Sequence, residues 1–140
     1  MPSVTAETTR LVLPSRIESV EQAAAVAEKM AERSGLNPEA AYHVDMALRE
    51  AIGNAVTHGN KKDENKNVTV VLTSSPGTLE IEVSDQGSGF DPATVPDPTV
   101  GENVLKPSGR GIFFMLTFMD EVSWSNTADG GTTVRLVKHS

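Results

Sequence analysis

Apolar residues recur at helical spacing in two stretches of the first half of the chain. Between residues 18 and 33 the apolar positions are Val20, Ala23, Ala24, Ala27, Met30 and Ala31. Gly35 follows and is typical of a helix end. The second stretch, residues 38–57, begins at Pro38, directly after the favoured N-cap residue Asn37. Its apolar stripe consists of Val44, Leu48, Ala51, Ile52 and Ala55. We expect an amphipathic helix in each stretch.

Alternation of apolar and polar residues predicts strands elsewhere in the chain. Residues 68–73 and 79–84 alternate with a period of two, and Ser75-Pro76-Gly77 between them is typical of a turn. We therefore expect a β-hairpin there. A first strand should end at residues 11–13, where Pro14 stops it. A second hairpin is expected from residues 122–125 and 132–137, around the turn at 128–131.

Residues 85–108 show little regular pattern, and an apolar helix is expected after them at residues 109–119. Such a long unpatterned stretch in a compact domain is typical of a functional lid or a linker. The order of elements predicts an α/β (α+β) sandwich, in which a mostly antiparallel sheet is covered by helices on one face. A length of 140 residues indicates one domain, with a short N-terminal tail over about residues 1–5.

The composition narrows the possible functions. The net charge is −7, so we expect no direct contact with nucleic acid, because phosphates repel an acidic surface. The chain has no cysteine, which excludes disulfides, thiolate metal sites and a cysteine nucleophile. It has no apolar run long enough to span a membrane and no signal-peptide pattern at its start. We therefore expect no membrane association and a cytoplasmic location.

Glu50 and Asn54 are four residues apart, so they stack on one face of the second helix, beside its apolar stripe. Polar side chains at the border of a core are costly unless they find partners. The pair forms either an ordinary solvated face or a site in which Asn54 holds Mg²⁺ and Glu50 orients or deprotonates a nucleophile. His58 follows one turn later, where it either complements the helix terminus or extends this site.

Asp85 ends a predicted strand on the same face as that strand's apolar residues. A carboxylate in this position needs a donor, and the amino group of a purine would serve. Gly87 and Gly89 follow, and glycines let the backbone approach a flat ligand. A plain turn with a capping aspartate explains the same residues equally well.

Two further glycine-rich segments are candidates for ligand contact. The segment 108–111, Ser-Gly-Arg-Gly, opens the third predicted helix, and helix N-termini bind anions. It matches neither a Walker loop nor a Rossmann fingerprint, and a simple connector is the alternative. The second segment, Gly130-Gly131, is typical of a hairpin turn. It leaves Thr132 and Thr133 as candidates to reach a ligand beside Asp85.

The order of these motifs is more specific than any one of them. The sequence Glu50-Ala-Ile-Gly-Asn54-Ala-Val-Thr-His58-Gly59 resembles the N box of the GHKL ATPase superfamily, whose members share the Bergerat ATP-binding fold. Residues 85–92 and 108–111 resemble its G1 and G2 boxes. Within the superfamily, residues 118–122 and the closing segment Gly-Gly-Thr-Thr-Val-Arg-Leu are most similar to bacterial anti-sigma factor serine kinases. The resemblance covers about residues 11–139.

The resemblance implies an ATP-dependent serine/threonine-protein kinase of the bacterial cytoplasm. Such a kinase phosphorylates an anti-anti-sigma factor, sequesters a sigma factor and exchanges these partners with the adenylate state; homodimers are common. Glu50 would act as general base, Asn54 would coordinate Mg²⁺, and Asp85 would accept from the adenine amino group. The other positions implied to bind ATP or ADP are His58, Gly87, Gly89, Lys106, Ser108, Gly109, Arg110, Gly111, Thr132 and Thr133. The resemblance also implies an ATP lid over about residues 91–107.

One position departs from the family pattern. Some members carry an arginine immediately before the Ser-Gly of the G2 box, where it reaches the terminal phosphate. Pro107 stands there in this chain, with Lys106 before it and Arg110 after it as possible substitutes. The alternative function is therefore a nucleotide-binding module with weak or no catalysis, acting by sequestration of a partner alone.

Overall fold

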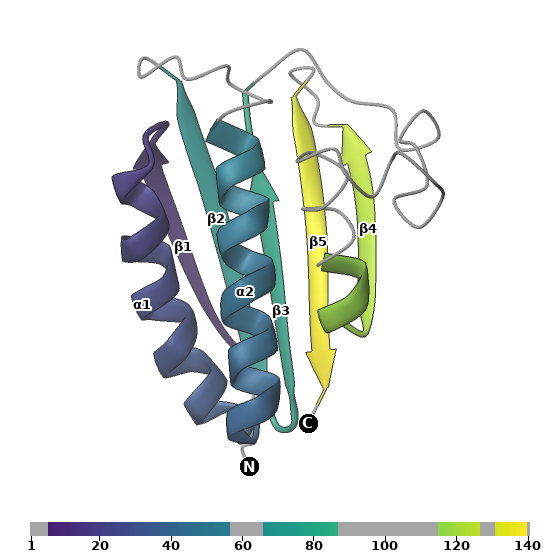
Figure 1. The fold of residues 1–140 in the computed structure, drawn as a ribbon. Helices are drawn as coiled ribbons and strands as arrows, with labels where there is room; N and C mark the ends of the chain where they lie inside the picture. The colour runs from purple at the N-terminus through teal and green to yellow at the C-terminus, as the bar shows by residue number, and fades with distance from the viewer. Residues whose placement is uncertain (1–5, 57–65, 87–114, 127–130, 140) are drawn as a thin grey trace.

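The computed structural model describes residues 6–56, 66–86, 115–126 and 131–139. Figure 1 shows two long helices in front of a sheet. A further short helical segment lies at residues 115–118. The elements in chain order are β1 (Glu7–Pro14), α1 (Glu18–Arg33), α2 (Pro38–Asn54), β2 (Asn67–Ser75), β3 (Thr78–Ser84), β4 (Glu121–Asn126) and β5 (Thr132–His139).

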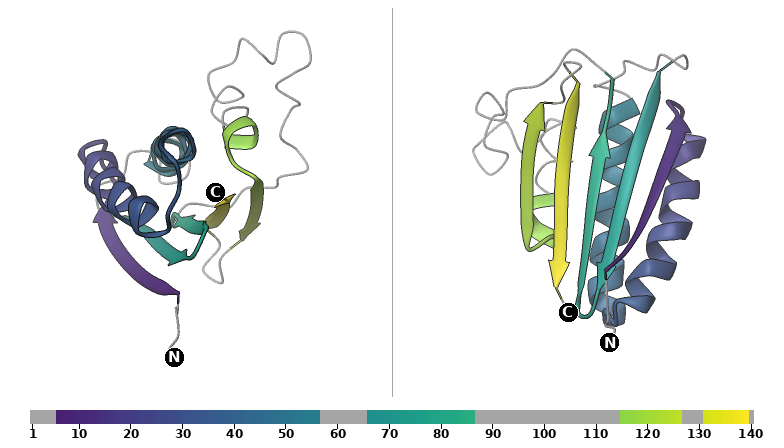
Figure 2. Two further views of the ribbon diagram at one scale, coloured as in Figure 1. Left: turned by 90° about the horizontal axis from the view of Figure 1, so that it is seen from below. Right: turned by 180° about the vertical axis from the view of Figure 1, so that it is seen from behind.

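The five strands form one sheet in the order β1-β2-β3-β5-β4, and every neighbouring pair is antiparallel. Figure 2 shows that α1, α2 and the short helical segment all lie on the same side of this sheet. The predicted α/β sandwich, with helices on one face of an antiparallel sheet, is therefore confirmed. Among the described residues, no helix is long and apolar enough to cross a membrane.

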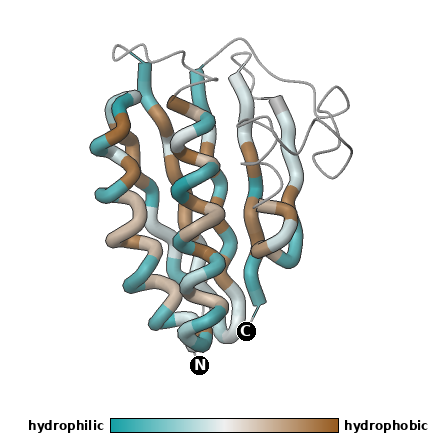
Figure 3. Tube along the Cα trace, viewed as in Figure 1, coloured by the Kyte–Doolittle hydropathy of each residue, from teal (hydrophilic) through white to brown (hydrophobic). Residues whose placement is uncertain are grey.

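The hydrophobic core lies between the helices and the covered face of the sheet. The alternating apolar positions of β2 and β3 are fully buried there, and the predicted stripes of both helices pack onto them. Figure 3 shows the apolar positions recurring along the helices and alternating along the strands. The largest fully buried side chains are Met30, Leu48, Ile52, Leu72, Leu79, Ile81, Met115 and Leu136.

The other face of the sheet carries no helix among the described residues, and its side chains are mostly polar. Arg135 forms an ion pair with Glu80 across β3 and β5 and lies 4.0 Å from the carboxylate of Glu121 on β4. Alternation of this kind is the ordinary result when only one face of an antiparallel sheet is buried. The sequence pattern in β3 therefore predicted which face the helices cover.

Turns and caps set the ends of the helices. The side chain of Asn37 accepts a hydrogen bond from Ala40 N at 2.8 Å, which confirms the predicted N-cap of α2. Gly35 follows α1 with φ of 80°. At the β2–β3 turn, Gly77 has φ of 75°, and its N–H donates to the carbonyl of Ser34 at 2.8 Å. That hydrogen bond ties the hairpin turn to the end of α1.

Several element bounds differ from the prediction. Pro14 is the last residue of β1 rather than its terminator; β1 is the edge strand, where a missing N–H costs no hydrogen bond of the ladder. Ser75 pairs with Thr78, so the turn has two residues rather than three. The α-helical part of α2 ends at Asn54 and continues through residues 55–56 as a wider π-type turn. The predicted helix at 109–119 is described only from residue 115 onward.

Candidate functional site

The carboxyl end of β3 meets the start of β5 at Asp85 and Thr132. The N–H of Asp85 donates to the carbonyl oxygen of Thr132 at 2.9 Å. In return, the N–H of Thr132 donates to Oδ1 of the Asp85 carboxylate at 3.1 Å. Asp85 follows the buried side chains of β3 in the two-residue alternation, so it lies on the helix-covered face, as expected. The structure therefore places the Asp85 carboxylate at the border of the core, held by a backbone donor.

Gly131 lies directly against Asp85 and is not among the residues that the sequence analysis singled out for the site. An ideal Cβ built on Gly131 would lie 2.1 Å from the carbonyl oxygen of Asp85 and 3.3 Å from its Oδ1. The sequence offered one signal, the second of two consecutive glycines before the threonine pair. A hairpin turn accounts for glycines in general, so that signal did not distinguish a turn from a close approach.

The two candidate threonines lie on opposite faces of the sheet, because successive strand residues alternate. Thr133 is paired with Ser84, and their hydroxyl oxygens are 2.7 Å apart on the uncovered face. Thr132 precedes it and falls on the covered face, with Asp85. Of the two, Thr132 is therefore the one that the structure brings to the aspartate.

The end of α2 supplies Glu50 and Asn54. Both side chains are half-buried and lie on the last turns of the helix, beside a stripe whose members are fully buried. In Figure 1 this end of α2, the end of β3 and the start of β5 all lie at the upper end of the molecule. Residues from three separate parts of the sequence are thus brought to one end of the fold.

Arg49 ties this part of α2 to α1. Its Nε donates to Asp45 at 2.9 Å, one turn earlier, and its Nη1 donates to Glu21 on α1 at 2.5 Å. The hydrogen bond from Arg49 and its positive charge hold the pKa of the Glu21 carboxyl below its usual value. This network fixes the helix turn that carries Glu50 against its neighbour.

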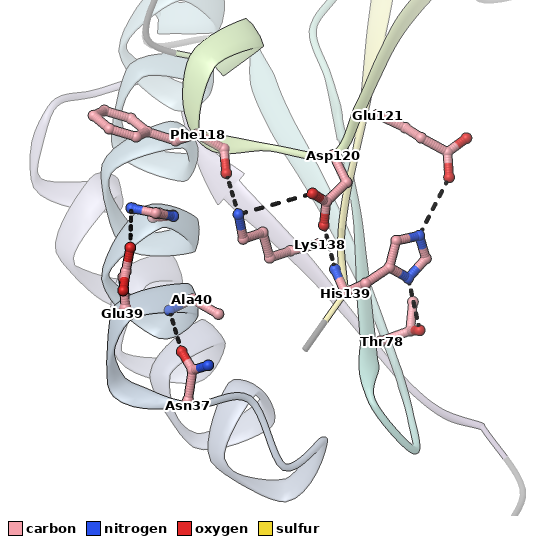
Figure 4. Close-up of polar contacts among 10 residues, drawn as sticks. Asn37, Glu39, Ala40, Thr78, Phe118, Asp120, Glu121, Lys138 and His139 are labelled. Carbon is pink, nitrogen blue, oxygen red and sulfur yellow. Dashed lines mark hydrogen bonds and ion pairs between the residues drawn. The ribbon is translucent and has the colours of Figure 1, made fainter.

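The short helical segment at residues 115–118 is anchored at the opposite end of β5 (Figure 4). The Nζ of Lys138 donates to the carbonyl oxygen of Phe118 at 2.6 Å and lies 4.0 Å from Asp120. Asp120 in turn accepts from the N–H of His139 at 2.6 Å. The Phe118 ring stacks on His43 of α2 with centroids 5.0 Å apart. These contacts attach the segment both to the sheet and to α2.

The remaining predicted site residues lie outside the described residues. They are His58, Gly87, Gly89, Lys106, Ser108, Gly109, Arg110 and Gly111, together with the predicted lid at 91–107. Among the described residues, no group of three His, Cys, Asp or Glu side chains could hold a metal ion. The amide oxygen of Asn54 is a ligand of the hard type that Mg²⁺ takes, so the donor chemistry at the end of α2 fits that ion.

A family model matches most of the chain. Residues 13–138 match the histidine kinase-like ATPase domain. The chain belongs to this family. Membership of an ATPase family implies that the domain binds ATP.

Individual proteins that resemble this chain come from bacteria. A protein of Listeria monocytogenes named serine-protein kinase RsbW is 33% identical, over 92% of this chain and 85% of its own length. The anti-sigma F factor of Geobacillus thermodenitrificans is 35% identical, over 69% of this chain and 67% of its own. The SiaB–SiaC complex of Pseudomonas aeruginosa contains a chain of the same fold, with a TM-score of 0.70 at 15% identity; the match covers 92% of this chain and 88% of that one.

Proposed function

We propose that this chain is an ATP-dependent serine-protein kinase and anti-sigma factor. It phosphorylates an anti-anti-sigma factor on serine, sequesters a sigma factor, and exchanges the two partners according to the adenylate state. The observation that carries the proposal is the 33% identity over 92% of the chain to a protein named serine-protein kinase. The relative named anti-sigma F factor supports the sigma-binding half of the function.

Recognition of the nucleotide base is the role of Asp85 in this proposal. Its carboxylate is an acceptor only, and the exocyclic amino group of adenine is a donor. A backbone N–H holds one of its oxygens at 3.1 Å, which supports a fixed orientation toward a flat base. Thr132 lies on the same face and supports the adenine from the neighbouring strand.

Transfer of the phosphoryl group is the role of the end of α2. The Glu50 carboxylate accepts the proton of the substrate serine hydroxyl as the serine oxygen bonds to the γ-phosphorus. The bond between that phosphorus and the β,γ-bridging oxygen breaks, and ADP leaves. Asn54 is proposed to hold Mg²⁺, which neutralises charge on the phosphates when bound. His58, the glycines of both boxes, Lys106, Ser108 and Arg110 are proposed to complete the nucleotide contacts.

The proposed partners are proteins. They are one sigma factor, one anti-anti-sigma factor and a second copy of the chain. We place this action in the bacterial cytoplasm, because transcription and its sigma factors are found there. We propose residues 1–140 as one domain that carries both activities, with residues 91–107 as the ATP lid.

The kinase proposal is tested by phosphate transfer. The purified chain and Mg-ATP are mixed with an anti-anti-sigma protein captured from the cells of origin, and phosphoserine is measured by mass spectrometry. Glu50→Gln should lower the transfer rate by about 10²–10⁴-fold while nucleotide binding persists. Glu28→Gln, at an exposed position on α1, is the matched control and should transfer at the normal rate. Equal loss of binding and transfer in Glu50→Gln would reassign Glu50 to nucleotide binding.

A second candidate function rests on Pro107, which stands where some family members have an arginine. In this alternative the chain binds nucleotide but acts only by sequestration. It predicts a stable complex with the captured partner and no phosphoserine on that partner. As a positive control, a kinase known to act on the partner should phosphorylate it under the same conditions. Rapid phosphorylation of the captured partner would exclude this alternative.

A further inference from the structure

The residue pair that follows the last paired residues of β3 and β5 is joined in part by a hydrogen bond to a side chain. Ser84 pairs with Thr133, so the antiparallel register sets Asp85 opposite Thr132. In a regular hydrogen-bonded pair of an antiparallel sheet, each residue donates its backbone N–H to the carbonyl oxygen of the other. Here Asp85 donates to the carbonyl of Thr132 at 2.9 Å, whereas Thr132 donates to the carboxylate Oδ1 at 3.1 Å. The first amide of β5 therefore holds the Asp85 side chain itself.

The pairing of Asp85 with Thr132 depends on the lack of a side chain at Gly131. Its Cβ would lie 2.1 Å from the carbonyl oxygen of Asp85 and 3.0 Å from its carbonyl carbon. Real Cβ atoms do not approach so closely, and the obstructing atoms are backbone, which cannot rotate away. Gly131 is also buried. Any larger residue must therefore push the start of β5 away from the end of β3.

The requirement for glycine here is one of space. Among the described residues, the glycines with positive φ are Gly35 and Gly77, and Gly131 does not share that conformation. A turn that needs a left-handed residue consequently does not explain Gly131. The close approach to Asp85 does.

We propose that Gly131 is a positioning residue for base recognition. Because Gly131 has no side chain, the Thr132 N–H can reach the Asp85 carboxylate. That hydrogen bond sets the orientation in which the carboxylate contacts a nucleotide base. The inference rests on the proposed nucleotide-binding function. A carboxylate held in one orientation accepts from the 6-amino group of adenine and repels the 6-carbonyl oxygen of hypoxanthine. Gly131 thereby contributes to selection of adenine over bases with a carbonyl at that position.

The test compares two nucleotides that differ at the 6-position edge of the base: ADP has a 6-amino group, whereas IDP has a 6-carbonyl group and a hydrogen on N1. Mg-ADP and Mg-IDP are titrated calorimetrically into the full chain and into Gly131→Ala. We expect the wild type to prefer ADP by about tenfold or more, as one hydrogen bond to a charged group implies. Gly131→Ala should lose most of this preference through weaker ADP binding, with IDP binding changed little. An unchanged ADP-to-IDP ratio in Gly131→Ala would overturn the inference.

A matched control separates positioning from loss of stability. Gly35→Ala forces a side chain into φ of 80° at the other end of the molecule, so it weakens the fold away from the site. It should lower the melting temperature and keep the ADP-to-IDP ratio. In the Asp85→Ala background, Gly131→Ala should lower the ratio no further, because the group that it positions is gone. A further loss there would contradict the positioning role.

A second measurement keeps the inference testable if Gly131→Ala does not fold. The NMR shift of the Thr132 amide proton should move upfield from its wild-type value in Asp85→Ala, because that substitution removes the carboxylate oxygen that accepts from it at 3.1 Å. A Thr132 amide shift that Asp85→Ala leaves unchanged would overturn the inference without affecting the proposed function. If the wild type binds neither nucleotide, the proposed function and the inference both fail; if it binds both equally, only base selection by Asp85 and Gly131 fails.

Discussion

The Nζ of Lys138 lies 2.6 Å from the carbonyl oxygen of Phe118, so the end of the short helical segment at 115–118 is attached to the last strand of the sheet. The Lys138 side chain is only 13% exposed, and its Nζ lies 4.0 Å from Oδ1 of Asp120. A hydrogen bond from a charged donor is stronger than one between neutral groups. This attachment holds the segment that follows the glycine-rich residues 108–111.

Removal of that attachment should weaken the fold. Lys138→Met keeps the length of the side chain and removes the donor, and it should lower the free energy of unfolding by about 1–3 kcal/mol. Urea denaturation followed by circular dichroism measures the change. Lys29→Met, at an exposed position on α1, is the control and should change stability by less than about 0.5 kcal/mol. Equal effects of the two substitutions would contradict the role of Lys138.

The N-cap of α2 is a second point of stability. Asn37→Ala removes the acceptor for Ala40 N and should cost about 1 kcal/mol in the free energy of unfolding. Asn37→Asp keeps an acceptor at the same place and should retain most of the stability. Thermal unfolding of the three proteins measures this. A fully stable Asn37→Ala would show that the cap contributes nothing in this context.

Two glycines should respond to alanine in opposite directions. Gly53 lies inside α2, and a Cβ there meets no described atom within 4 Å, so Gly53→Ala should raise stability by about 0.5–1 kcal/mol. Gly35 has φ of 80°, so Gly35→Ala should lower stability by about 1 kcal/mol. Chemical denaturation of both variants at one pH gives the comparison. Changes of the same sign would refute the conformational argument.

The ion pair between Glu21 and Arg49 should leave a pH signature. The pKa of the Glu21 carboxyl is lowered in the folded state, chiefly by the hydrogen bond from Arg49. The ionised carboxylate therefore stabilises the fold at pH values above the pKa that Glu21 has in the unfolded chain. This contribution disappears as the pH falls through the folded pKa. Glu21→Gln should therefore melt slightly below the wild type near neutral pH, and the two should converge in acid. Because Glu21 is at the surface, the difference should also shrink at about 1 M salt.

The local elements follow from short-range patterns in the sequence. The stripe from Val44 to Ala55 predicted a buried helix face, and the alternation from Leu79 to Val83 predicted which side of the sheet is covered. Both are confirmed because side-chain direction repeats every 3.6 residues in a helix and every two in a strand. Pro14 shows the limit of such rules. Its place inside β1 depends on that strand being at the edge, which is a property of the whole sheet.

The candidate site divides in the same way. Residue types and their order pointed to Glu50, Asn54 and Asp85, because those types carry the chemistry wherever the chain brings them together. The local pattern could not choose between Thr132 and Thr133, since that choice depends on the register of β5 against β3.

Gly131 and Lys138 went unnoticed for a related reason. A steric contact with Asp85 and a hydrogen bond to Phe118 both join residues far apart in the sequence. Periodicity and composition report on the residue and its near neighbours along the chain. Contacts of this kind exist only once the sheet has paired and the helices have packed on it, so they follow from the assembled fold.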